Sequence, residues 1–130
     1  MTTRELSRLY WLNREIAVEK NRLAELEAAA TGITQKINGL PHVTGISDKT
    51  AMAAEIADAK AIIEAKTMMA VVEYNRLNRY IASVDDSLVR QIMMLRFVSG
   101  LPWNQVADSI GGNNSEDSVK KICYRYLKAN

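Results

Sequence analysis

Two long stretches without glycine or proline, each with apolar residues at coiled-coil spacing, constrain the fold of this chain more than any other feature. The first runs from Thr3, a candidate N-cap, to Ala30. Glu19 is the one charged residue in its apolar seam, whose members alternate at steps of three and four: Leu9, Leu12, Ile16, Leu23, Leu26 and Ala30. This spacing predicts a long helix that needs a partner helix.

The second stretch begins at Ser47 or Asp48, either of which can cap a helix, and runs to Ser83. Four of its apolar residues, and Val84 just after its end, recur at seven-residue spacing: Ile56, Ile63, Ala70, Leu77 and Val84. Residues 31–47 contain three glycines and Pro41, so we expect them to connect the two helices as an antiparallel hairpin. A leftover apolar face predicts self-association or docking; it consists of Met68, Met69, Val71, Val72 and Tyr74.

The last part of the chain divides into three shorter helices. Asp85 and Asp86 are N-terminal signals for the first of these helices, and Gly100 ends it. Pro102 lies in the first turn of the second helix, which the residues GGNN at 111–114 end. Ser115 caps the next helix, whose predicted inner face is Val119, Ile122, Cys123, Tyr126 and Leu127. We therefore predict an all-α fold, with a coiled-coil-like hairpin at 1–84 and a trihelical helix-turn-helix unit at 85–130.

The position of the charged residues is more informative about DNA binding than the net charge. The formal net charge is only +2, but from Ser118 onward four cations meet no acid. A short helix, a Gly-containing turn and a capped basic helix outline a helix-turn-helix, whose second helix enters the major groove of DNA. The candidate DNA-binding residues are Asn114, Ser115, Ser118, Lys120, Lys121, Tyr124, Arg125 and Lys128. Helix packing and capping alone explain the same pattern, so this outline does not decide between the two.

Neighbouring residues have structural interpretations. Glu116 and Asp117 suit the positive end of the helix dipole. We expect Trp103 to pack in the core against the preceding helix, and Arg96 to form an ion pair with Asp108 or Glu116.

The residue inventory predicts neither catalysis nor a cofactor. His42, the one histidine, has no Cys or clustered carboxylate near it, so we expect no metal site. Cys123, the one cysteine, is expected to be a buried structural thiol in a reducing compartment. The absence of a signal-peptide pattern and of an apolar run of about twenty residues predicts a cytoplasmic protein without membrane contact.

The segment from Leu95 to Lys128, LRFVSGLPWNQVADSIGGNNSEDSVKKICYRYLK, resembles the C-terminal promoter-reading region of bacterial sigma factors. A Leu-Arg-aromatic stretch and a Gly-Leu turn are followed by Val106, Ala107, Ile110 and Gly111, and then by Ser115, Glu116, Ser118, Val119, Lys120, Arg125 and Leu127. With the hairpin before it, the chain resembles the small sigma-like late-gene regulators of phages and prophages, the ArpU and RinA group.

The resemblance implies sequence-specific binding of double-stranded promoter DNA in a bacterial host cell, with contact to host RNA polymerase. The N-terminal helices would serve homodimerisation or polymerase contact. Gly112, Asn113 and Asn114 make the turn longer than the usual sigma turn, and residues 1–84 lack the clustered aromatic and basic residues that capture single strands. Two alternatives stay open: a small terminase-like packaging protein, and an interaction protein that binds RNA polymerase without touching DNA.

Overall fold

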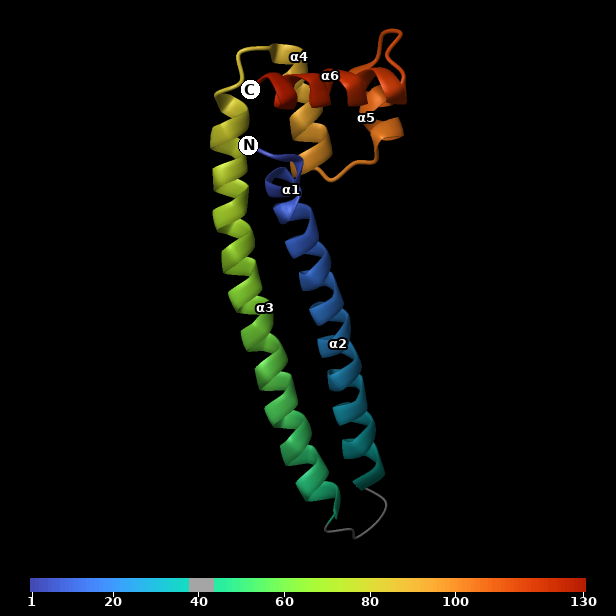
Figure 1. The fold of residues 1–130 in the computed structure, drawn as a ribbon. Helices are drawn as coiled ribbons and strands as arrows, with labels where there is room; N and C mark the ends of the chain where they lie inside the picture. The colour runs from blue at the N-terminus through green and yellow to red at the C-terminus, as the bar shows by residue number, and fades with distance from the viewer. Residues whose placement is uncertain (38–43) are drawn as a thin grey trace. The chain divides into compact units, whose positions relative to one another are not determined.

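A computed structural model describes the backbone of residues 1–37 and 44–130 and the side chains of residues 1–32 and 49–130. Every element in these ranges is helical, which confirms the all-α prediction (Figure 1). In chain order they are α1 (Thr3–Leu6), α2 (Arg8–Ile37), α3 (Thr44–Ala82), α4 (Ser87–Met93), the π-helix η1 (Met94–Val98), α5 (Trp103–Ile110) and α6 (Glu116–Ala129).

The chain packs as two units. Unit 1 consists of residues 1–12 and 70–130, and unit 2 of residues 13–69. Each long helix contributes one segment to each unit, so the units are defined by packing. The functional division at residue 84 stays a prediction.

The first long helix starts differently from its prediction. It is interrupted at Ser7, which leaves α1 as one capped turn before α2. Thr2 is the N-cap, because Glu5 N donates to its hydroxyl (3.2 Å) while Thr2 N donates to Glu5 Oε2 (2.9 Å). The predicted cap, Thr3, is the first helical residue.

The ends of the hairpin helices were also predicted too short. α2 continues past Ala30 to Ile37, and α3 begins at Thr44 before Ser47. One internal glycine, Gly32, costs a helix only about 1 kcal/mol, so it does not stop α2. The rest of the predicted connection, residues 38–43 with Pro41 and His42, lies outside the described residues.

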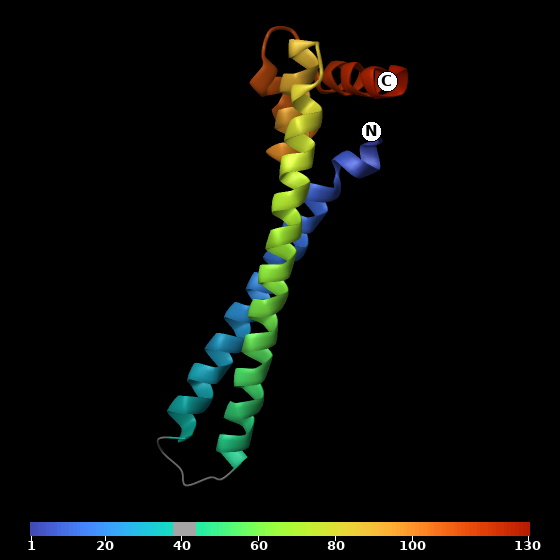
Figure 2. The same ribbon diagram turned by 90° about the vertical axis from the view of Figure 1, so that its left-hand side faces the viewer.

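In unit 2, residues 13–37 of α2 and 44–69 of α3 lie side by side and run in opposite directions (Figures 1 and 2). Ile16 and Ala59 are buried, and Lys66 Nζ lies 3.8 Å from Glu15 Oε2. Glu19 Oε2 is buried too, with Arg22 Nη1 4.0 Å away, which is too long for a hydrogen bond. The seam of unit 2 therefore holds an incompletely satisfied carboxylate.

In unit 1, α6 lies across α4 and beside α5 (Figure 1). Five side chains of these helices are almost fully buried: Ile92, Met93, Val106, Val119 and Cys123. The predicted inner face of α6 is confirmed, because Ile122, Tyr126 and Leu127 are half-buried beside Val119 and Cys123.

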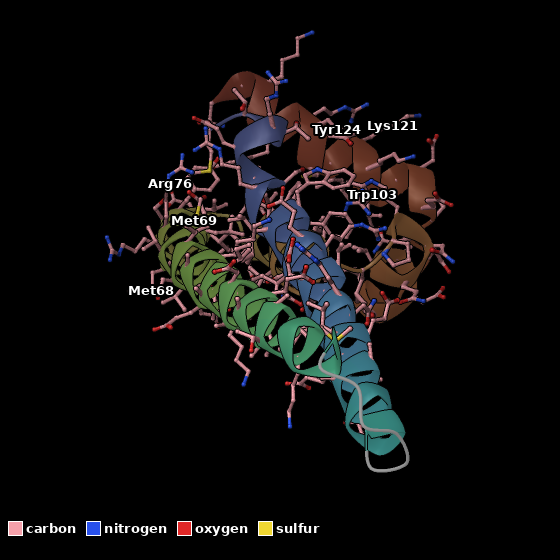
Figure 3. All side chains as sticks on the ribbon, turned by 90° about the horizontal axis from the view of Figure 1, so that it is seen from below. Met68, Met69, Arg76, Trp103, Lys121 and Tyr124 are labelled. Atoms are coloured by element: carbon pink, nitrogen blue, oxygen red, sulfur yellow. The ribbon has the colours of Figure 1, made fainter. Side chains whose placement is uncertain are left out.

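A chain of ion pairs joins the first residues of unit 1 to the end of α3. Arg76, labelled in Figure 3, lies 3.6 Å from Glu5 and 3.1 Å from Glu73. Arg8 lies 3.9 Å from Glu73. The Thr2 N–H lowers the pKa of the Glu5 carboxyl, and the Arg76 guanidinium lowers it further. These contacts connect α1 and the start of α2 to the part of α3 that belongs to unit 1.

The predicted punctuation of the short helices is largely confirmed. Asp86 Oδ1 accepts from Leu88 N (2.9 Å) and Val89 N (3.2 Å) at the start of α4. Gly100, with φ 71°, follows the end of η1 in a conformation that glycine adopts easily. Pro102 is the N-cap of α5 and not a residue of its first turn, since its carbonyl accepts from Gln105 N and Val106 N at 3.0 Å.

The face predicted to be left over is exposed: Met68, Met69, Val71, Val72 and Tyr74. Met68 lies on the side of α3 away from α2 (Figure 3). None of the helices in the described ranges has both the length and the apolar character that crossing a bilayer requires.

Ile92 tests the core of unit 1. Ile92→Ala leaves a cavity at a fully buried position and is expected to lower the free energy of unfolding by about 2–5 kcal/mol. The matched control on the same helix is Leu88→Ala, at a position that is 36% exposed; it should cost less than about 1 kcal/mol. Urea unfolding followed by circular dichroism measures both, and equal losses would contradict the described core.

Candidate nucleic-acid interface

The outward side of α6 carries half of the predicted DNA-binding residues. Lys121, Tyr124, Arg125 and Lys128 are exposed, because burial of Val119 and Cys123 fixes the rotation of the helix. Lys121 and Tyr124 lie together on α6, with Trp103 of α5 beneath them (Figure 3). The helix therefore presents a mixed basic and aromatic strip that other described side chains leave uncovered.

The two lysines of the first half of α6 pair with acids one turn earlier. Lys120 Nζ lies 4.0 Å from Glu116 Oε1, and Lys121 Nζ lies 3.2 Å from Asp117 Oδ2. Exposed pairs at this spacing contribute only about 0.3–0.5 kcal/mol, so a phosphate can replace the acid as partner. They nevertheless make the start of α6 nearly neutral, which the four-residue spacing in the sequence could have indicated.

The second half of α6 is where positive charge stands uncompensated. Arg125 and Lys128 form no hydrogen bond or ion pair with any described residue. The carboxyl end of the helix favours cations, so these charges also suit the helix dipole. Among the predicted DNA-binding cations, the structure therefore leaves Arg125 and Lys128 uncompensated, whereas Lys120 and Lys121 have acidic partners.

The polar candidates of the turn already have partners. Asn114 Nδ2 donates to Gly111 O (3.0 Å), and Ser118 Oγ donates to Asn114 Oδ1 (3.4 Å). Ser115 caps α6, because its hydroxyl accepts from Ser118 N (3.1 Å). Gly111 and Gly112 have φ of 75° and 65°. The structure accounts for these three side chains by the geometry of the turn, and their contact with DNA stays a prediction.

Arg96 does not form the predicted ion pair with Asp108 or Glu116 in the described part of the chain. Its Nη1 donates to Leu101 O (3.1 Å), and its Cζ lies 4.8 Å from the centre of the Trp103 ring. A guanidinium can stack on an aromatic face, and here it also satisfies a carbonyl in the segment between η1 and α5. Trp103 is 6% exposed, as its predicted core position requires.

Trp103 in turn supports the outer side of α6. Its ring lies 5.8 Å from that of Tyr124, at an interplanar angle of 64°. Such edge-to-face pairs contribute about 0.5–1.5 kcal/mol beyond the burial of area. Arg96, Trp103 and Tyr124 come from three elements, so no local sequence signal marks this stack.

Cys123 lies on the opposite, buried side of α6. Burial raises the pKa of its thiol from 9.0 to about 11, and the Arg96 guanidinium opposes this increase. Burial also raises the pKa of Tyr80, with Tyr126 and Cys123 adding to the effect. The thiol is therefore protonated and shielded, as predicted for a structural cysteine.

Comparison of the chain with models of protein families, with curated proteins and with solved structures finds no match.

Cys123 makes stability depend on pH. As the pH rises from 9.0 toward 11, the unfolded chain releases the thiol proton while the folded chain keeps it, so the free energy of unfolding should fall. Cys123→Ala should show a smaller fall over the same range. Urea unfolding across this pH range measures the difference, and identical pH profiles would contradict a buried thiol.

Proposed function

We propose that the chain is a sequence-specific DNA-binding regulator of transcription, which acts at a phage promoter together with host RNA polymerase. The observation that supports it most is the uncovered strip of Lys121, Tyr124, Arg125 and Lys128 on a capped helix whose other face is buried. A helix held in this way can enter the major groove with its outward side chains. The assignment to phage late genes rests on the resemblance of residues 95–128 to sigma factors.

Modest net charge is compatible with this function, because local charge determines phosphate contact. Each phosphate that a cation neutralises releases counterions, so affinity falls steeply as salt rises. Arg125 and Lys128 need not give up an acidic partner to bind a phosphate, whereas Lys120 and Lys121 must exchange one. We therefore assign the larger share of phosphate binding to Arg125 and Lys128.

One observation favours a second candidate. Because Glu116 and Asp117 neutralise the start of α6, this end would approach DNA bases without net attraction. An RNA-polymerase-binding protein without DNA contact would have no such conflict. Footprinting over the promoter beside the gene, in excess random duplex, separates the candidates: protection supports the DNA-binding regulator, and crosslinking to polymerase without protection supports the alternative.

Removing the uncompensated charges tests the proposal directly. Arg125→Gln with Lys128→Gln should weaken duplex DNA binding by about tenfold or more at low salt, and should reduce the slope of log affinity against log salt by about two. Fluorescence anisotropy with a labelled promoter duplex measures both.

The matched control is Lys49→Gln with Lys60→Gln, which removes the same charge from exposed positions of unit 2. It should leave the salt slope nearly unchanged. Equal effects of the two double variants would mean that net charge, and not α6, determines binding.

Asp117 offers a test in the opposite direction. Asp117→Asn frees Lys121 from its 3.2 Å ion pair and removes a negative charge from the outward side of α6. We expect duplex affinity to rise by roughly threefold to tenfold, because the freed cation can bind a phosphate. The same anisotropy titration detects this, with Asp58→Asn in unit 2 as control; a loss of affinity would instead indicate that Asp117 accepts a hydrogen bond from a base.

A further inference from the structure

Unit 1 contains a pocket of about 450 Å³. It is lined by Tyr10 and Trp11 of α2, Arg96 and Phe97 of η1, and Gly100 and Pro102 before α5. A Cβ at Gly100 would lie 3.6 Å from Tyr10 Cδ2, an ordinary contact, so glycine is favoured there by its φ of 71° and not by lack of space. The sequence places these residues in two distant segments, so the pocket exists only in the folded chain.

The lining combines aromatic rings with one cation and no carboxylate. The centroids of the Tyr10 and Trp11 rings are 5.1 Å apart and the ring planes meet at 82°. The two rings are therefore packed edge to face, and neither is stacked on the other. Trp11 stays 60% exposed, which is unusual for so large an apolar ring. The Arg96 guanidinium and the Ser7 hydroxyl add polar groups at the same pocket. Aromatic faces beside a guanidinium are the chemistry that holds unpaired bases and their phosphates.

The pocket is connected to the candidate interface on α6. Arg96 lines the pocket and lies 4.8 Å from the Trp103 ring, which is 5.8 Å from Tyr124 on the exposed side of α6. These three residues form a row of one guanidinium followed by two aromatic rings. The pocket and the outer side of α6 therefore share Arg96 through the buried Trp103 ring.

We propose that this pocket binds an unpaired nucleobase of a DNA strand, stacked on Trp11 with its phosphate near Arg96. The inference rests on the proposed DNA-binding function and adds to it a site for single-stranded or opened DNA. This single-strand site was not expected from the sequence, because residues 1–84 show no aromatic and basic cluster by themselves. The fold supplies the missing cation from η1.

A labelled oligothymidylate of about twelve nucleotides is a suitable probe. The full-length chain should bind it with strong salt dependence. Trp11→Ala should weaken this binding by about tenfold or more, because one stacking surface is lost. Trp11→Phe retains a ring and should recover most of the affinity. Anisotropy of the labelled strand measures all three proteins.

Two controls separate this site from the duplex interface. Tyr74→Ala removes another exposed ring of unit 1 that does not line the pocket, and it should leave oligothymidylate binding unchanged. Trp11→Ala should leave the affinity for promoter duplex within about twofold. If oligothymidylate binds through Trp11 but no duplex binds, the promoter function fails while the pocket assignment stands.

A crosslink gives a measurement that does not depend on a variant folding. Oligothymidylate carrying 5-iodouracil should crosslink to Trp11 or Tyr10, as read by mass spectrometry of peptides. The proposal is overturned if wild-type protein does not bind the strand at low salt, if Trp11→Ala binds it equally well, or if crosslinks fall elsewhere. A second outcome would also overturn the proposal: an acidic aromatic peptide quenches Trp11 fluorescence and the oligonucleotide does not. The pocket would then be a protein-docking site.

Discussion

The burial of one face of α6 against α4 and α5 is the interaction on which the rest of unit 1 depends. Val119 and Cys123 are fully buried there, beside Ile92 and Val106. Burying a side chain such as Val or Ile stabilises the folded state by roughly 1.5–3 kcal/mol. The rotation of α6 about its axis is therefore firmly set. Once the rotation is set, the outward positions follow from 3.6-residue periodicity, including those of Arg125 and Lys128.

Features decided within one or two helical turns could be predicted from the sequence. The caps at Asp86 and Ser115, the stop at Gly100 and the inner face of α6 depend on neighbouring residues, and the structure has them as expected. The helix ends near Ala30 and Ser47 were wrong, because a single glycine or a possible cap lowers helix stability too little to end a helix that can continue. The break at Ser7 had no recognised signal, although the Thr2 and Glu5 capping box was present in the sequence.

The candidate site was only partly predictable for the same reason. The exposed cations of α6 follow from its periodicity, and the pairs with Glu116 and Asp117 follow from four-residue spacing. The position of Arg96 over Trp103 could not be foreseen, because it depends on where η1 and α5 meet. Such contacts between elements distant in sequence are also what bring Tyr10 and Trp11 next to Arg96.

The π-helical turn η1 makes this arrangement sensitive to chain length. Its wider hydrogen-bonded loop, with Ser99 N donating to Met94 O, accommodates one residue more than an α-helical turn would. A homologue that lacked one residue between Met94 and Val98 would return to α-helical geometry and rotate the preceding side chains by about 100° relative to those that follow. Relatives with the extra π-helical residue would therefore keep Arg96 over Trp103. Relatives without this residue would lose that contact, even if all their other residues were the same.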